Sequence, residues 1–368
     1  MERDKAYKML LWILIPLSIG LIIFAFFAPK LFVKEAVSQE LNFTETGNIG
    51  DTIGGLMNPF IALAGVIVTF LAFYIQYKFN EFQITEFRKE LKANKEKYEK
   101  DKFENQFYEM LRLHKENVNE LYVKIKKKRN DGQIIEESIY GRRVFEYLIL
   151  ELSVSYIVAI YSFIKDNLTP KERLNEAYGV FFQGLTEKDL EKHQFFKNLK
   201  KLQNLIADFD YEGFDKEIKS HIKLQEGNYI SHKIEFQMFE GYNHQLAHYY
   251  RHLFQTVKFV ANQDENLISY NQKRNYIRIL RAQLSNNEQA LLFYNWHSDF
   301  GKQWENDSNK FLTDYRMIHN IYNDLLISEF KLEDIFDINN GYKKEEGRAS
   351  DNLFEFQDWE IKNLIPKT

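Results

Sequence analysis

The chain has 368 residues, and its 49 Lys and Arg nearly balance 53 Asp and Glu, which excludes the strongly basic composition of a general nucleic-acid-binding protein. It contains no Cys, and this excludes disulfides, thiolate zinc sites and cysteine nucleophiles. Of its 5 Pro, only Pro170 lies between Pro59 and Pro366. So long a stretch with a single helix breaker predicts an all-α fold.

Two charge-free apolar segments near the N-terminus are predicted to cross a membrane. Residues 9–28 carry no charge over 20 positions, about the length that spans a ~30 Å hydrocarbon layer as a helix. Residues 57–77 form a second such run, and Pro59 near its start is expected to lie at the beginning of the helix. A cleaved signal peptide is disfavoured, because the first run exceeds a usual signal-peptide core and no small-x-small site follows it. We therefore expect a transmembrane hairpin over residues 1–78.

The cations that flank these runs predict the orientation of the hairpin. They are concentrated outside the two runs, at Arg3, Lys5, Lys8, Lys78, Arg88, Lys89, Lys92, Lys95 and Lys97. The connection over residues 29–53 holds two Lys beside four acids. Because cytoplasmic flanks are enriched in Lys and Arg, we expect a protein of the bacterial inner (cell) membrane with both termini in the cytoplasm.

A long connecting helix is predicted over residues 79–130, because no Gly or Pro occurs between Val66 and Asp131. Its charged surface is interrupted by an apolar seam of Phe79, Phe82, Phe87, Leu91 and Tyr98. A narrow seam is typical of a helix that packs on another helix. Two partners stay open, the chain's own body and further copies in a homo-oligomer.

The basic residues that follow are expected to close this helix before Gly132. They are Lys124, Lys126, Lys127, Lys128 and Arg129. Cations are favourable at a helix C-terminus, and the alternative is a patch for nucleic acid or anionic lipid.

Residues 131–368 are predicted to form a cytoplasmic helical domain. The expected helices cover 140–167, 169–184, 187–208, 212–226, 231–262, 265–284 and 286–301. Pro170, after Thr169, is expected at the first position of a helix, and Thr186 before Glu187 is a possible cap. The Ser285-to-Glu288 spacing is that of a capping box.

Three histidines, His244, His248 and His252, recur at intervals of four on one predicted helix face. The outer two are separated by ~12 Å along a helix axis, so one ion can bind at most an adjacent pair. The candidates for further ligands are Glu240, His232, His297 and Asp299. A pH-sensitive interface or an ordinary polar face are the alternatives, and we expect neither a resident metal nor a cofactor.

Four segments, 103–118, 141–152, 241–260 and 276–295, in this order behind two membrane spans, resemble the AbiC-like group of phage abortive-infection membrane proteins. The resemblance implies bacterial antiphage defence, in which an infected cell is stopped before the phage matures, but no defined reaction. It also singles out Tyr250, Arg251, Arg281, Gln283, Ser285, Glu288 and Asn295 as candidate functional positions.

A catalytic function has weaker support. The chain lacks the standard phosphate-loop, dinucleotide, serine-hydrolase and zinc-protease motifs. It also lacks the R-x(4 to 6)-H signature of helical RNases, so an Arg and a His would have to come from separate helices, with Arg251 or Arg281 acting beside His297.

Two functions therefore stay open. The preferred one is an oligomeric, non-enzymatic membrane effector that responds to a phage-derived or infection-induced trigger and perturbs the lipid bilayer. The alternative is a membrane-tethered RNase or other enzyme directed at nucleic acid. A receptor that recruits another effector is a third, less specific interpretation.

Overall fold

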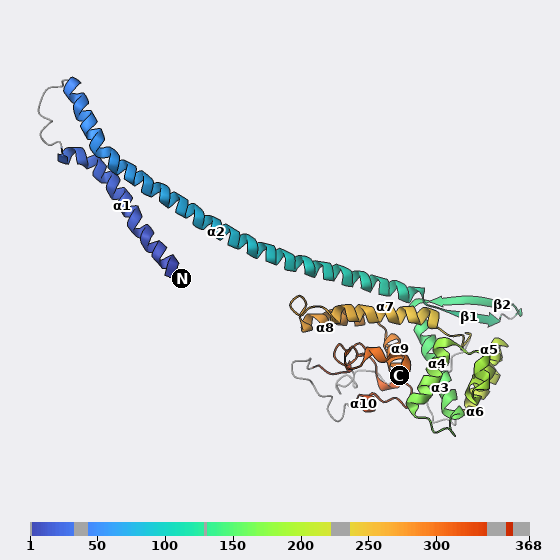
Figure 1. The fold of residues 1–368 in the computed structure, drawn as a ribbon. Coiled ribbons are helices and arrows are strands. Elements are labelled where there is room, and N and C mark those ends of the chain that lie inside the picture. Colours follow the sequence, from blue (N-terminus) through green and yellow to red (C-terminus); the bar gives the residue numbers. More distant parts are fainter. Residues whose placement is uncertain (1, 33–42, 129–130, 222–235, 337–350, 356–368) are drawn as a thin grey trace. The chain divides into compact units, whose positions relative to one another are not determined.

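The computed structural model describes residues 2–32, 43–128, 131–221, 236–336 and 351–355 (Figure 1). The chain divides into two compact units, Met1–Tyr98 and Glu99–Thr368. Helix α2 (Phe43–Glu120) contributes to both of them. The described residues are mostly helical, as the composition predicts.

The first unit consists of α1 (Glu2–Phe32) and the beginning of α2. The two helices contact each other where Ser18, Ala25, Ala64 and Leu71 are buried, three of them small, in a unit whose other apolar side chains are largely exposed. Phe24 and Phe60 pack edge to face at this contact, with ring centroids 5.0 Å apart. Small residues let apolar helices approach closely, which is the usual way in which such helices associate.

The second apolar helix begins earlier than predicted. It starts at Phe43, so Pro59 lies inside α2 and does not mark its beginning. A proline inside a helix removes one backbone donor, and apolar helices tolerate this better than most because neighbouring groups compensate.

By length and composition, two helical segments of the described chain are apolar enough to cross a membrane. They are Gly50–Glu120 and Gly141–Ser162, whose most apolar windows are 11% and 56% buried. The second segment contains α3 (Val144–Ser162), whose apolar side chains pack within the second unit, so we interpret it as a core helix. Helix α1 adds a shorter apolar stretch, Leu11–Phe27.

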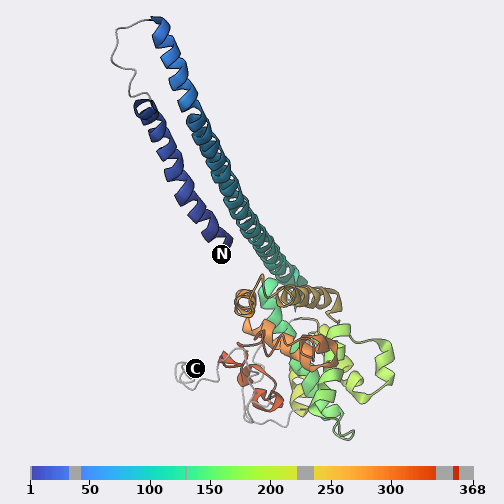
Figure 2. The same cartoon turned by 60° about the vertical axis from the view of Figure 1, so that its left-hand side comes forward.

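In the second unit, the last turns of α2 run antiparallel to α7 (Asn243–Ala261; Figure 1), and the two helices lie side by side in both views (Figures 1 and 2). Phe103 stacks on Phe259 with centroids 5.3 Å apart. Beyond the end of α2, the Gln245 side chain accepts a hydrogen bond from the Tyr122 N–H at 2.8 Å and donates to the Tyr122 carbonyl at 3.2 Å. One amide side chain thus ties the chain after α2 to the start of α7.

A β-hairpin follows α2, and the prediction of helix to residue 130 was therefore wrong. Strands β1 (Tyr122–Lys128) and β2 (Ile134–Tyr140) pair antiparallel, with Tyr122 opposite Tyr140. Residues of β1 form a strand because buried Val123 and Ile125 alternate with lysines, which is the two-residue periodicity of a strand with one buried face. The Lys124 to Lys128 cluster consequently lies on a strand and does not close a helix.

The remaining elements largely follow the predicted order. They are η1 (Gly141–Arg143), α3, α4 (Pro170–Gln183), η2 (Glu187–Glu191), α5 (Gln194–Ala207), α6 (Tyr211–His221), α7, α8 (Tyr270–Arg281), α9 (Asn286–His297), η3 (Asp299–Trp304), η4 (Asn323–Leu325) and α10 (Leu332–Ile335). The predicted helix over 187–208 is split, because the His193 Nδ1 accepts a hydrogen bond from the Phe195 N–H and caps α5.

The core gathers around α3, which contacts α4, α5 and α9. Glu151 on this helix is fully buried and accepts hydrogen bonds from the Phe239 N–H and the Tyr242 hydroxyl, both at 2.8 Å. It thereby fixes the turn that precedes α7. In the same turn, a Cβ added to Gly241 would lie 2.4 Å from the Gly184 nitrogen, and one added to Gly184 would lie 2.5 Å from the Glu240 carbonyl oxygen.

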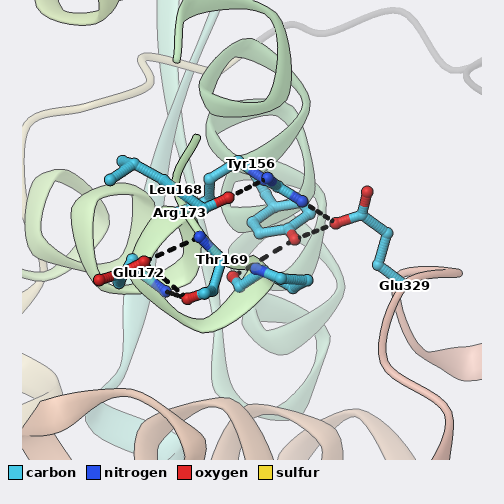
Figure 3. Close-up of polar contacts among 7 residues, drawn as sticks. Tyr156, Leu168, Thr169, Glu172, Arg173 and Glu329 are labelled. Carbon is cyan, nitrogen blue, oxygen red and sulfur yellow. Dashed lines mark hydrogen bonds and ion pairs between the residues drawn. The ribbon is translucent and has the colours of Figure 1, made fainter. Parts of the chain in front are cut away.

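The start of α4 is fixed by a cap at Thr169, and Pro170 opens the helix as the sequence predicts (Figure 3). The Thr169 N–H donates to Glu172 at 2.8 Å, and the Glu172 N–H donates back to the threonine hydroxyl at 3.2 Å. Beside this cap, Glu329 accepts hydrogen bonds from the Tyr156 hydroxyl and from Arg173. A carboxylate from the irregular C-terminal part thus joins α3 to α4.

Candidate functional site

A buried histidine of α2, His114, faces a half-buried histidine of α7, His252, where the two helices pack. The rings of His114 and His252 are nearly parallel, at 16°, with centroids 6.2 Å apart. All four ring nitrogens are buried and have no hydrogen-bond partner within the described part of the chain. Burial, with His252 and Arg142 nearby, lowers the pKa of His114 to about 4, and burial lowers the pKa of His252 as well. The His114 imidazole is therefore neutral at neutral pH, and the neutral form of His252 is favoured.

A buried carboxylate lies next to this pair. The ring of Tyr249 is 5.5 Å from that of His114, and its hydroxyl donates to Oε1 of Glu288 at 3.4 Å. Glu288 is 0% exposed. Its Oε2 accepts a hydrogen bond from the Ser285 N–H at 2.6 Å and lies 3.2 Å from Nε of Arg142. Burial raises the pKa of Glu288, whereas the Ser285 hydrogen bonds and the Arg142 charge oppose that rise.

Arg142 connects this carboxylate with solvent. It belongs to η1, directly after the hairpin, and its Nη2 donates to the Gln283 carbonyl at 2.5 Å. Its side chain is 56% exposed. We name the five residues His114, Arg142, Tyr249, His252 and Glu288 the Glu288 cluster. It joins α2, η1, α7 and α9 through titratable side chains.

Of the three predicted histidines on α7, only His252 belongs to the Glu288 cluster. His244 and His248 are exposed, as is Arg251. His244 and Glu240 line a small cavity of about 110 Å³ together with Lys124 and Gln245. No group of three or more His, Asp or Glu in the described ranges is arranged to hold a metal ion. His232, a predicted further ligand, lies outside the described residues.

Tyr250 and Asn295 lie in a second, fully internal network. Asn295 Nδ2 donates to the Tyr178 hydroxyl at 3.0 Å, and the Tyr178 hydroxyl donates to that of Tyr250 at 3.4 Å. The Tyr250 hydroxyl in turn donates to the Leu291 carbonyl at 3.2 Å. Burial raises the pKa values of both tyrosines. These contacts join α4, α7 and α9 in the core.

Arg281 and His297 have different surroundings in the described structure. Arg281 Nη1 donates to the Arg316 carbonyl at 3.0 Å. His297 stacks on Phe293 with centroids 5.5 Å apart, and burial followed by the charge of Lys171 lowers the pKa of its ring to about 4. The histidine whose pKa responds to Arg281 is His319, which the sequence did not single out.

The position of His114 in the core could have been predicted from the sequence. Its spacing from Phe103, Phe107 and Val118 places it on the same buried stripe of α2, where a polar side chain is unusual. Arg142 had no comparable signal, because its position depends on the hairpin before it. The capping box at Ser285 and Glu288 is confirmed, but the same carboxylate also binds Arg142.

The comparison with protein families gives one match. Residues 241–325 match the family described as putative phage abortive infection protein (putAbiC). This segment holds α7, α8 and α9, and with them Tyr249, His252 and Glu288 of the Glu288 cluster. The resemblance expected from the sequence is thereby confirmed, and the match indicates a role in phage abortive infection. The curated proteins and the solved structures gave no match.

Proposed function

We propose that this protein is a membrane-anchored abortive-infection effector, in which a cytoplasmic helical body responds to infection and alters the packing of the membrane hairpin. One observation supports this proposal above all others. Helix α2 includes the apolar run over 57–77 and also the buried stripe from Phe103 to Val118. The element predicted to cross the membrane is thus also part of the core that holds the Glu288 cluster.

Anchoring in a membrane is supported by the surface of the first unit. Large apolar side chains there are exposed along both helices, for example Trp12 at 80%, Phe26 at 76%, Val66 at 66% and Phe73 at 67%. So much exposed apolar surface is unfavourable in water and favourable in hydrocarbon. The flanking cations favour cytoplasmic termini.

The Glu288 cluster is a suitable place for a signal to act on α2. His114 belongs to α2, and its partners come from α7, η1 and α9. A trigger that separates Arg142 from Glu288, or that protonates an imidazole, introduces an uncompensated charge beside α2. We infer that α2 then repacks and that the change reaches the apolar spans.

Self-association through the apolar seam completes the proposal. Phe79, Phe82, Phe87, Leu91 and Tyr98 are exposed at 56%, 62%, 60%, 52% and 65% in turn. Phe79 and Phe82 also line an open groove of about 860 Å³ with Leu11 of α1. Because two spans enclose no channel, opening a membrane requires several chains, and the seam is where we expect them to join.

The test is to follow membrane potential in phage-infected bacteria that express the full chain, with a potential-sensitive dye. We expect depolarisation when growth stops, and its loss in a Phe82→Ser, Phe87→Ser double variant. A Lys92→Ser variant should keep it, because Lys92 is exposed outside the groove beside α1 and lies at least about 80° around the helix from each seam residue. A membrane potential that persists throughout arrest would contradict the effector proposal. Degradation of cellular RNA before any depolarisation would instead favour the tethered enzyme.

A further inference from the structure

Exposed side chains on α2 form a heptad repeat, which we name the heptad face. It starts at Leu63 and advances by three and four residues in turn as far as Tyr98. Two of its positions are polar, Asn80 and Asn94, and every other position carries a large apolar side chain. The apolar members are exposed by between 51% at Leu63 and 67% at Phe73. The whole face lies within the first unit.

The contact with α1 uses a different face of α2. Ala64 and Leu71 are buried at that contact, and each of them follows a member of the heptad face by one position. A step of one residue turns the helix by about 100°. Phe79 and Phe82 of the apolar seam also lie on the side of α1, because they line the groove with Leu11. The heptad face is therefore left uncovered when α1 is packed in place.

A repeat of this kind indicates a helical partner. Apolar residues that recur every 3.5 positions stay on one side of a helix only if it supercoils around another helix of the same period. A lipid imposes no such period. The face also continues beyond the predicted span, from Ile84 to Tyr98, where exposed apolar side chains are unfavourable in water. Lipid would therefore cover only the first part of the heptad face.

The charges beside the face favour a second copy of α2 in a parallel arrangement. With Leu63 at heptad position a, Glu90 falls at g and Lys95 at the next e, and both are exposed. In a parallel, in-register pair, each g residue lies beside the next e residue of the other helix, so Glu90 meets Lys95 of the second copy. The first like-charged pair would be Lys97 with Lys102, and the apolar repeat ends there.

The two polar positions favour the same arrangement. Asn80 and Asn94 both fall at d, where the side chains of a parallel, in-register pair meet their own counterparts. An amide carries both donors and an acceptor, so two identical amides satisfy each other. A partner with an apolar residue at either place would bury an amide without a hydrogen bond, which costs free energy.

We propose that the heptad face pairs with the heptad face of a second copy, parallel and in register, so that the membrane spans continue into a coiled coil as far as Tyr98. This inference rests on the proposed function, because it specifies how the chains of the effector join. The two-fold axis runs along the paired helices, and identical positions therefore lie opposite each other at every level of the face.

The test uses single cysteines in the otherwise cysteine-free full chain, in membranes of uninfected cells. Asn80→Cys and Asn94→Cys should each give disulfide-linked dimers on mild oxidation with copper phenanthroline, because identical core positions lie within the ~7 Å that a disulfide can bridge. Glu96→Cys is the matched control, since it is 67% exposed and lies about 160° around the helix from Asn94. We expect about tenfold less dimer from it, because its Cα atoms are too far apart to be bridged.

An exchange of charges tests the register independently. In the Asn80→Cys chain, Glu90→Lys should lower the dimer yield about threefold, the effect of losing surface ion pairs. Adding Lys95→Glu should restore the yield, because the opposite charges then meet again across the pair.

A disulfide at only one of the two asparagine positions would overturn the proposal. These positions are ~21 Å apart along the helix, so an antiparallel pair brings at most one of them to its own counterpart. No dimer from either variant, an equal yield from Glu96→Cys, or no recovery after the charge exchange would also overturn it. In each of these cases the effector proposal survives if infection still depolarises the membrane. Dimers at both positions in a chain that never depolarises the membrane would contradict the effector proposal alone.

Discussion

His114 on α2 and His252 on α7 lie with their rings nearly parallel and their centroids 6.2 Å apart, in a place where none of their nitrogens meets a partner within the described residues. Burying an imidazole without a hydrogen bond costs free energy, and burying it with a positive charge costs more. The contact between these helices therefore depends on both rings being neutral.

Stability should consequently decrease in acid because of this pair. The pKa of His114 is lowered to about 4 in the folded chain, so between the unfolded value of about 6.5 and that value the unfolded chain binds more protons. The free energy of unfolding should fall by up to about 1.4 kcal/mol per pH unit for this group as pH drops through that range. His114→Phe should show a shallower decline in denaturant titrations at pH 5 to 7. A decline as steep as in the wild type would contradict the prediction, and His244→Phe on the surface is the control.

Truncating the Glu288 side chain should destabilise the protein more than neutralising its charge. Glu288→Gln keeps an oxygen for the Ser285 N–H and leaves the half-exposed Arg142 free to turn to water, so we expect a cost of about 1 to 2 kcal/mol. Glu288→Ala removes the side-chain half of the capping box and leaves a cavity in the core, and we expect about 3 kcal/mol or more. Denaturant titration at pH 7 tests the order, which equal costs for the two variants would contradict.

Glu151 should give a pH dependence of stability opposite to that of His114. Burial raises its pKa to about 8, against hydrogen bonds from Phe239 and Tyr242 that favour the charged form. Between its unfolded value near 4.5 and that value the folded chain binds more protons, so this group's contribution to stability is lost as pH rises. Glu151→Gln should therefore lose less stability between pH 6 and pH 8 than the wild type. Unfolding curves at the two pH values measure this, and a steeper loss in the variant would disprove it.

The absence of cysteine makes the seam testable by cross-linking. If copies join through it, Phe87→Cys should give covalent dimers with a short bismaleimide in membranes. Lys92→Cys, about 140° around the helix from Phe87 and turned away from the other seam residues, should give few, although both side chains are exposed in the single chain. Gel electrophoresis under denaturing conditions gives the yields. Equal yields would argue against a specific interface.

The elements that depend on local sequence could be predicted. The helix start at Pro170 and the capping box at Ser285 need only residues within one or two turns, and both are confirmed. The hairpin was missed because its period of two lasts only a few residues and its lysines also suit a helix end. The earlier start of α2 was missed because Pro59 usually marks a helix start rather than an interior position.

The candidate sites could be predicted only in part, since each combines residues that are distant in sequence. Arg142 and Glu288 meet because the hairpin turns the chain back toward α9. Asp351 pairs with Arg274 although 77 positions separate them in the sequence, and helical periodicity does not predict such a contact. The regular spacing of His244, His248 and His252 was visible in the sequence, but the sequence does not show which of the three rings packs against α2.

The close contact between Gly184 and Gly241 restricts the substitutions that each position can accept during evolution. The backbones of the two loops touch so closely that neither position has room for even one methyl group, and both residues adopt a positive φ. Natural variation at one of these sites is thus constrained by the other, although 57 positions separate them. Among relatives, a lineage that acquires a side chain at either glycine should also have rerouted the opposite loop, and the two sites should diverge together.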